Sequence, residues 1–456
     1  MTQTGPTQQT RVNPVLDGAV TGTLLRLAWP MIVSNQLTNG VVLITALWVG
    51  RFVGKDGLAV LAVWVPVELL LAWLLAAITQ GHGSLISQSI GNADGQGLRL
   101  VGASLVLKLI ASLALAGCGL LALEPLVHLL SGESDLVPMF RSYLVPFFLS
   151  LPVLGIAEIL LETALCAGRT RLAMFRVLFD LCLMATLMPI LIQIFGLGVA
   201  AAPWAVLIAA VILDVSLAFT IVRSRREMGL GDWPVGARVI DPALWLQLLG
   251  IGAPIQLGRV ASFAAQIGLV HLVARAGKIE TAGYGLCIDV LFVAPLATMG
   301  VAAANAIVVG QSRGAARPAR ARMSIARALL TNFVIAAALI AAVPLARPLF
   351  RLFSNDLAVI DAAMEALLLM RWSAIGIGVW QVLATSSMAL GTSTRAGLAM
   401  VVFQGLGVGV AYSVGLAPLK AAAIGFAVAQ LGTAGALMLI FPTTFRKAFQ
   451  TAGEVP

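Results

Sequence analysis

Residues 151–181 have the sequence LPVLGIAEILLETALCAGRTRLAMFRVLFDL, two apolar segments joined by a short turn that carries two arginines. Three carboxylates, Glu158, Glu162 and Asp180, lie inside these apolar segments. A carboxylate at membrane depth costs roughly 3 kcal/mol on insertion scales, so it is rarely present there without a partner or a function. Glu158 and Glu162 are four residues apart, which places both on one face of a helix. We interpret this acidic face as the lining of a cavity that binds protons, cations or both.

The composition of the whole chain indicates a membrane protein. Of its 456 residues, 60% are hydrophobic and only 11% are charged, and the mean hydropathy is +0.98. Soluble globular proteins carry about 25% charged residues. Apolar runs of about twenty residues recur along the sequence, and each can cross a ~30 Å hydrocarbon core as a helix. The short alternating segments of a membrane barrel are not found. The sequence therefore predicts an all-α, polytopic membrane protein.

The apolar runs fall into two sets of six, separated by a charged stretch. We place the twelve spans at residues 26–50, 58–82, 100–123, 140–166, 173–195, 199–222, 246–273, 282–308, 325–346, 362–390, 396–416 and 421–442. The chain is thereby divided into a disordered cytoplasmic leader (1–22), an N-lobe (23–222), a cytoplasmic linker (223–244), a C-lobe (245–445) and a cytoplasmic tail (446–456). The leader lacks the apolar core of a signal peptide.

Arginine and lysine are concentrated in alternate loops. The richer set contains Arg99, the turn at 169–176, the linker, residues 313–327 and Arg395. The positive-inside rule then predicts that both termini are cytoplasmic, in a bacterial plasma (inner) membrane. The same asymmetry explains the net charge of +9 better than nucleic-acid binding does.

The two halves repeat each other. Pro30 in LAWP corresponds to Pro254 in IGAP, 224 residues later, and Arg51 corresponds to Arg275 at the same offset. With six spans per half and both termini on one side, the repeats share one orientation. This predicts two six-helix bundles related by a pseudo-twofold axis along the membrane normal, with a site within or between them.

Short motifs then occur in a characteristic order along both halves. They are Pro30, Val49-Gly50-Arg51, LAVLA at 58–62, SQSIGNAD at 87–94, AGRTR at 167–171, FGLGVA at 195–200, GAP at 252–254, VGQ at 309–311 and LGT at 390–392. Through them, over about residues 23–445, the chain resembles the multidrug and toxin extrusion (MATE) transporters. The resemblance implies a twelve-helix exporter with alternating access, a proton or sodium gradient as energy source, and substrates that are often amphipathic organic cations.

The chain departs from the family pattern where coupling residues are expected. Family members often carry an Asp near the end of the first span, where this chain has Thr45, and a Glu in the seventh span, near Ser262. An Asp expected in the tenth span is also missing, since no acid lies between Arg371 and Gly391. We therefore do not transfer the family's coupling residues, and the coupling ion stays open.

The predicted exchange site lies in the N-lobe and consists of Glu158 and Glu162, with Glu68 and Asp180 in support. Desolvation disfavours the charged form of a carboxyl group, so an acid in a cavity can bind and release protons as its surroundings change. The alternative for Glu158 and Glu162 is a structural ion pair or hydrogen bonds between helices. Asp180 lies one turn after Arg176 and could pair with it.

Other charged residues in the spans favour structural roles. We expect Asp214 to be structural, and Asp289 to form a pair with Arg259 inside the C-lobe. Such a pair is a structural lock by default, although it could also accept an anionic group of a substrate. Lys108 and Arg371 are the remaining bases within spans.

Several site types find no support in the sequence. His82, His128 and His271 are far apart, the four cysteines lie in apolar runs, and no metal-ligand spacing is present. Residues 50–56 lack the full spacing of a phosphate loop. We therefore expect no metal, no cofactor, no nucleotide and no enzymatic activity.

We predict a secondary-active exporter of a small, amphipathic, cationic organic compound, driven by inward proton movement. The expected partners are this substrate, protons or sodium, and the lipid bilayer, with the protein as a monomer. The alternatives are a sodium-coupled exporter and a flippase for a lipid-linked intermediate. A flippase needs a wide basic cavity, which Lys108, Arg259 and Arg371 keep possible.

Overall fold

The computed structural model describes residues 13–131, 134–232 and 239–453, in which all regular secondary structure is helical. Within these residues eleven helices are long and apolar enough to cross a membrane, or twelve if the bent pair α12–α13 is one span. Helices are the expected solution because a chain in lipid must satisfy its backbone hydrogen bonds internally. The prediction of an all-α, polytopic membrane protein is confirmed.

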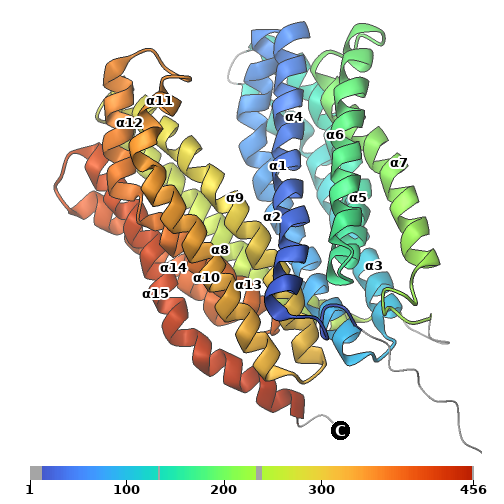
Figure 1. Ribbon diagram of the computed structural model, residues 1–456. Coiled ribbons are helices and arrows are strands. Elements are labelled where there is room, and N and C mark those ends of the chain that lie inside the picture. Colours follow the sequence, from blue (N-terminus) through green and yellow to red (C-terminus); the bar gives the residue numbers. More distant parts are fainter. Residues whose placement is uncertain (1–12, 132–133, 233–238, 454–456) are drawn as a thin grey trace, which may run out of the picture.

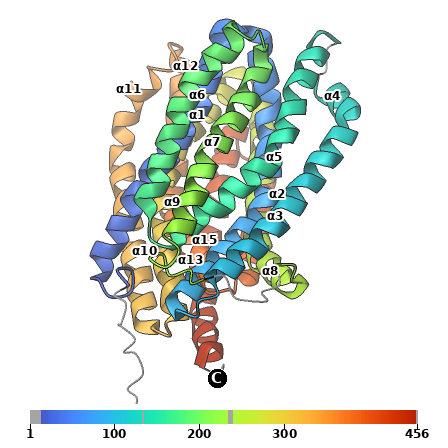
Figure 2. The same cartoon turned by 90° about the vertical axis from the view of Figure 1, so that its right-hand side faces the viewer.

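The first half contains six long helices and one short one. Their bounds are α1 (Val20–Phe52), α2 (Lys55–Asn92), α3 (Gly97–Leu121), α4 (Leu123–Ser131), α5 (Val137–Cys166), α6 (Thr170–Gln193) and α7 (Ala201–Arg223), with 3-10 turns η1 (Ser134–Leu136) and η2 (Gly198–Ala200). The short helix α4 lies near the end of the molecule opposite the C-terminus (Figure 2).

The second half repeats this order, with one helix broken. Its elements are α8 (Pro242–Ala274), α9 (Lys278–Gly314), α10 (Pro318–Ala342), η3 (Val343–Leu345), α11 (Ala346–Phe350), α12 (Leu357–Met370), α13 (Ser373–Ala389), α14 (Thr394–Ser413) and α15 (Pro418–Gly453). The break between α12 and α13 bends the chain by 52°. It falls inside the tenth predicted span.

Most of the other predicted spans fall on one helix, but the span at 325–346 runs from α10 through η3 to the start of α11, and the span at 199–222 begins in η2. Helices α2 and α9 continue well past their predicted ends. Helix α2 runs to Asn92, beyond the predicted end at 82, and Ser84, Ser87 and Ser89 in this extension are buried. Hydropathy underestimates such a segment because its hydroxyl groups are hydrogen-bonded inside the protein instead of facing lipid.

The predicted leader is ordered from residue 13 onward, which corrects the expectation of disorder for that part. Val15 and Leu16 are buried, and the guanidinium groups of Arg317 and Arg320 donate hydrogen bonds to the carbonyls of Leu16 and Val15. Helix α1 begins at Val20. Residues 1–12 lie outside the described residues.

The predicted linker and tail are also partly built into the helices. Asp241 caps α8 by accepting a hydrogen bond from the Leu244 amide at 3.2 Å, so the helix starts within the predicted linker. Helix α15 continues to Gly453 and takes in most of the predicted tail.

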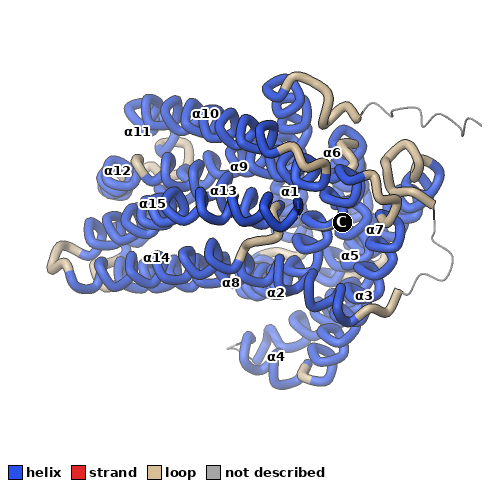
Figure 3. The backbone as a smooth tube through the Cα atoms, turned by 90° about the horizontal axis from the view of Figure 1, so that it is seen from below, coloured by secondary structure: helices blue, strands red, loops and turns tan. Residues whose placement is uncertain are grey.

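The helices form two lobes that lie closest near the end carrying the C-terminus and diverge toward the opposite end (Figure 1). Viewed along the molecule, the lobes lie side by side, with α1 and α2 near the middle (Figure 3). Helix α2 packs on α8 and α9, and in the same way α9 packs on α1 and α2. These reciprocal contacts fit the pseudo-twofold relation expected from the sequence repeat.

Glycines allow the two lobes to approach at backbone distance. A Cβ atom at Gly252 of α8 would lie 1.8 Å from the carbonyl oxygen of Ala77 on α2. One at Gly91 of α2 would lie 2.1 Å from the carbonyl oxygen of Gln311 on α9. Any side chain at either position would therefore push the helices apart.

Candidate functional site

Glu158 on α5 is paired with Lys108 on α3. The Lys108 ammonium donates hydrogen bonds to Glu158 Oε2 at 2.7 Å, to the Leu75 carbonyl at 2.8 Å and to Thr79 Oγ1 at 2.9 Å. The Thr79 hydroxyl in turn donates to Glu158 Oε2 at 2.9 Å. All three N–H donors of the lysine therefore have acceptors, as a buried ammonium requires.

The two partners of this pair differ in exposure. The Lys108 side chain is fully buried, whereas 40% of the Glu158 side chain is exposed. The lysine charge thus depends on Glu158, while the carboxylate is held on one side and accessible on the other. A group of this kind can exchange a proton or a cation without exposing its partner.

Glu162 lies one turn further along α5 and faces α2. Its Oε1 accepts a weak hydrogen bond from the Cys166 thiol at 3.5 Å, and no basic side chain pairs with it among the described residues. A Cβ atom on Gly83 of α2 would lie only 2.3 Å from Glu162 Oε1. The carboxylate therefore occupies space that a glycine leaves open.

His82 is fully buried beside these acids and joins three helices. Its Nε2 lies 2.9 Å from Thr163 Oγ1 on α5, and its Nδ1 lies 3.0 Å from Ser104 Oγ on α3. The Thr163 hydroxyl donates to the Ile159 carbonyl at 2.7 Å, so it must accept from the histidine. An imidazole with its proton on Nε2 satisfies both neighbours. This geometry gives His82 a structural role beneath the acidic face.

Asp180 belongs to a different cluster, between α6 and α7. Arg176 lies 3.6 Å from Asp180 Oδ2 and 3.1 Å from Asp214 Oδ1. The structure thus forms the alternative considered for Asp180, a pair with Arg176. It also gives Asp214 the same partner, on the neighbouring helix. Neither acid forms a hydrogen bond with Glu158 or Glu162 in the described chain.

Glu68 lies on α2, and no side chain in the described residues forms an ion pair with it. It precedes Thr79 by eleven residues, about three turns, so both lie on one stripe of the helix roughly 16 Å apart. Glu68 is therefore not part of the Lys108–Glu158 contact in this conformation.

In the C-lobe, the expected pair of Asp289 and Arg259 is not formed within the described residues. Asp289 is exposed on α9, and no cationic side chain in the described residues forms an ion pair with it. Arg371 lies at the bend between α12 and α13, and its guanidinium carbon is 5.2 Å from the centroid of the Trp372 ring. It too lacks a carboxylate partner in the part of the chain that is described.

Each half of the chain matches the same family of known proteins. The family model described as MatE matches residues 30–190 and 254–413, which together exceed half of the sequence. The two matches begin at Pro30 and Pro254, the same pair that the internal repeat relates.

The chain belongs to the MATE family.

Individual relatives are distant but cover most of the protein. The chain is 23% identical over 370 residues, 80% of each sequence, to "Probable multidrug resistance protein YoeA" of Bacillus subtilis. It is 21% identical to the "FAD transporter" of Shewanella oneidensis, over 76% of this chain and 77% of that one. A crystal structure of MATE in the bent conformation superposes with a TM-score of 0.88 at 20% identity, covering 96% and 98% of the two chains. The protein is thus a membrane transporter of the MATE fold and not an enzyme.

Sequence reasoning found the acids of the N-lobe but missed what holds them. The sequence identifies Lys108 only as a base within a span, and it predicts neither the contact of Thr79 with Glu158 nor the second contact of Arg176, with Asp214. A buried lysine needs an anionic partner, which was the signal available for Lys108. Which acid pairs with Lys108 depends on how α3 and α5 are rotated about their own axes, and no local sequence pattern specifies that rotation.

Proposed function

We propose that this MATE protein is a proton-coupled exporter of small amphipathic organic cations and that Glu158 and Glu162 carry the exchange. One observation carries the proposal: Glu158 is the partner of a fully buried lysine, yet 40% of its side chain remains exposed. The relatives named as probable multidrug resistance proteins support export as the activity.

The proposed exchange follows from charge balance. A proton on Glu158 removes the anion that compensates Lys108, and an uncompensated ammonium inside the protein is costly. The protein then favours a conformation in which Lys108 finds another arrangement, so proton binding is linked to the change of access. Glu162, without a basic partner in the described residues, offers a carboxylate to a cationic substrate.

Uptake of a cationic dye into everted vesicles, the direction that corresponds to export from the cell, tests this assignment. Replacing Glu158 and Glu162 by Gln should abolish dye transport driven by a pH gradient, while membrane insertion is unchanged. Glu124→Gln is the matched control, because Glu124 pairs with exposed Arg141 outside the proposed site. Unchanged transport in the double variant would refute the assignment. Exchange of sodium for potassium at fixed pH, with and without an uncoupler, distinguishes the two possible driving ions.

The topology that we propose places both termini in the cytoplasm of a bacterial cell. The arginines of the turns at 167–169 and 315–317 lie on the side that carries the C-terminus, as the positive-inside rule requires. The diverging lobes then face the outside. Labelling of single cysteines in these two turns by a membrane-impermeant maleimide should fail in intact cells and succeed in everted vesicles; the reverse would invert the topology.

A second candidate is export of an anionic compound. Arg259 and Arg371 are membrane-depth cations with no carboxylate partner among the described residues, and one relative is named a FAD transporter. The same basic side chains suit a flippase for a lipid-linked phosphate. Transport assays with cationic, zwitterionic and anionic compounds decide between these classes, since competition by anions alone would reject the cation proposal.

A further inference from the structure

Helix α2 contacts the acidic site of the N-lobe with one side and the C-lobe with the other. Toward the site, its Leu75 carbonyl and its Thr79 hydroxyl both accept hydrogen bonds from the Lys108 ammonium, at 2.8 Å and 2.9 Å. Two of the three acceptors of this buried charge are therefore on α2, and the third is Glu158 on α5. The two α2 acceptors belong to one turn, because in an α-helix the carbonyl of residue 75 also accepts from the amide of residue 79.

The opposite side of α2 is packed on α8 of the C-lobe. Ala77 and Gly81 precede and follow Thr79 by two residues, and residues two apart project from nearly opposite sides of an α-helix. A Cβ atom at Gly252 of α8 would lie 1.8 Å from the Ala77 carbonyl oxygen. One at Gly81 would lie 2.1 Å from the Leu248 carbonyl oxygen. The turn of α2 that binds Lys108 thus touches the backbone of the other lobe on its far side.

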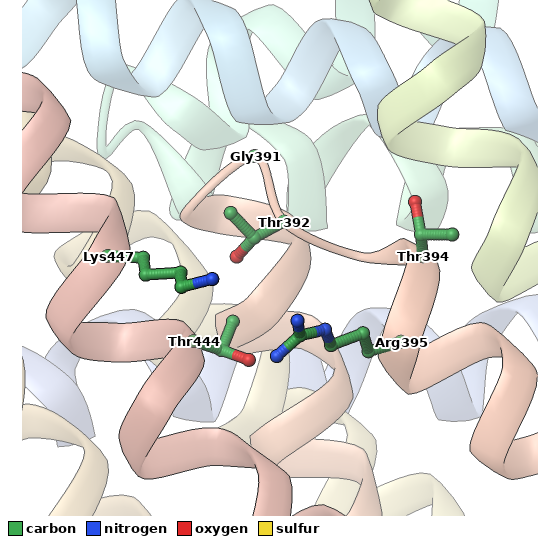
Figure 4. A pocket seen from close by; sticks show the side chains of 6 residues that line it. All are labelled: Gly391, Thr392, Thr394, Arg395, Thr444 and Lys447. Atoms are coloured by element: carbon green, nitrogen blue, oxygen red, sulfur yellow. The ribbon is translucent and has the colours of Figure 1, made fainter.

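The next turns of α2 bond directly to the C-lobe. The Ser84 hydroxyl donates to the Met388 carbonyl at 2.7 Å, and the Gln88 amide donates to the Ala389 carbonyl at 2.8 Å. Both acceptors are at the end of α13, and Figure 4 shows the turn that follows, from Gly391 to Thr394. One continuous helix therefore joins the Lys108–Glu158 pair to the contact between the lobes.

Thr79 is the side chain of α2 that contacts both members of the pair. Its hydroxyl accepts from Lys108 and donates to Glu158 Oε2 at 2.9 Å, and a hydroxyl group can do both at once. A proton on Glu158 removes the anion, and the ammonium then keeps only the two acceptors on α2. The change in charge therefore acts first on the turn formed by residues 75–79.

The geometry points to Thr79 as a positioning residue that links the protonation of Glu158 to α2, and through α2 to the contact between the lobes. The inference rests on the proposed function, because it takes Glu158 as the group that binds the proton. It adds the element that transmits the change. A helix packed at backbone distance on α8 cannot shift at Thr79 without altering that packing, since close-packed interfaces do not deform continuously.

Several other ionisable groups lie on α5 and on the helices packed against it, and a pH response has to be assigned among them. Those bonded away from Glu158 are Asp180 and Asp214 with Arg176, Glu124 with Arg141, and His82 with Thr163 and Ser104. Glu162 on α5 and Glu68 on α2 have no cationic partner in the described residues. The Glu158→Gln variant separates a response of Glu158 from a response of any of these groups.

The distance between spin labels at residues 55 and 278, at the starts of α2 and α9, reports how far the lobes diverge. In the native chain, a change from pH 8 to pH 5 should shift the distribution toward shorter distances, because protonation of Glu158 disfavours the conformation described here. Thr79→Val keeps the shape of the side chain without the hydroxyl, and should give the same distribution at both pH values. Thr79→Ser keeps the hydroxyl and should restore the shift.

Thr433→Val is the matched control. Thr433 is also buried in a spanning helix, but among the described residues its hydroxyl bonds only to the Ala429 carbonyl of its own helix, at 2.7 Å. It should leave the pH-dependent shift as large as in the native chain. If Thr79→Val is not recovered as a folded protein, Thr79→Ala carries the same expectation.

Uptake of a cationic dye into everted vesicles gives a second readout. When a pH gradient drives it, uptake should be about tenfold slower in Thr79→Val, because the hydroxyl makes two hydrogen bonds to charged groups. Uptake should be close to native in Thr79→Ser and in Thr433→Val.

The outcomes separate this inference from the proposed function. A native pH-dependent shift in Thr79→Val, or loss of the shift in Thr433→Val as well, would overturn the role of Thr79. If Glu158→Gln has lost the shift in the same experiment, the proposed exchange at Glu158 still stands. A native shift in Glu158→Gln would refute Glu158 as the proton-binding group, and the role of Thr79 with it.

Discussion

The side chains of Lys108 and Glu158 differ in burial, and this makes their removal unequal. Glu158→Ala leaves a fully buried ammonium with only Thr79 and the Leu75 carbonyl as acceptors. We expect the free energy of unfolding to fall by about 3 kcal/mol, which is the lower end of the range for removing one partner of a buried ion pair. Lys108→Met leaves a carboxylate that is 40% exposed, so the loss is smaller.

The double variant Lys108→Met/Glu158→Ala should recover much of the stability that Glu158→Ala loses, because it removes the uncompensated charge. Transport should remain absent, which separates stability from exchange. Thermal unfolding of the purified variants in detergent provides the measurement. If Lys108→Met lowers the melting temperature as much as Glu158→Ala does, the lysine does not depend on its partner as the geometry requires.

At the level of single residues, the sequence identifies which acids are unusual but not what they contact. The pair of Asp180 and Arg176 was foreseeable, since four residues on one helix fix their distance. The pair of Glu158 and Lys108 joins residues 50 positions apart on two helices, and depends on the rotation of each helix. The same uncertainty explains why Asp289 and Arg259, on adjacent helices, were expected together but are not paired in the described chain.

Among the elements, the segment 13–18 connects the two lobes. Its Asn13 amide donates to Gln311 Oε1 at 3.1 Å, and the Gln311 amide donates to the Cys166 carbonyl of α5 at 2.7 Å. Asp17 accepts a hydrogen bond from Arg317 at 3.0 Å, which holds the pKa of its carboxyl below the usual 3.8. Since the folded pKa is lowered, the contribution of Asp17 is present above that usual value and is lost only as the pH falls through the lower one.

Asp17→Asn should therefore lower the hydrogen-exchange protection of residues 13–18 several-fold, by about the same factor at pH 5 and at pH 8, because the native carboxylate is ionised throughout this range. Asp94→Asn, on the α2–α3 turn, is the control for charge removal on the same side of the molecule. An effect of Asp17→Asn that appears only at the higher pH would contradict the lowered pKa.

The existence of the helices was predictable, but their ends and the break in the tenth span were not. Apolar runs define membrane helices because backbone groups in lipid must bond internally. The polar end of α2 is helical for another reason, since Ser84 and Gln88 bond to the α13–α14 turn of the other lobe. Such a contact exists only in the assembled fold. The order of residues 13–18 has the same origin.

For the whole molecule, the repeat at an offset of 224 residues predicts two equivalent lobes. The two matches to the family model begin at residues 30 and 254, which are separated by the same offset. The conformation that the lobes adopt was not predictable. One sequence must encode at least two arrangements in a transporter that alternates access, so no pattern specifies one of them. The arrangement found here depends on contacts at the end that carries the C-terminus, where α2 crosses α8 at backbone distance.

This crossing can be disturbed by one methyl group. A Cβ atom at Gly252 would lie 1.8 Å from the Ala77 carbonyl oxygen, and a backbone atom cannot move aside as a flexible side chain can. Gly252→Ala should therefore disfavour the conformation with the lobes in contact here. Spin labels at 55 and 278 should report shorter distances at the diverging end, and dye efflux should slow. Gly250→Ala is the matched control, with no neighbour within 4 Å of its added methyl group. Equal distance distributions in the two variants would show that this crossing does not hold the lobes together.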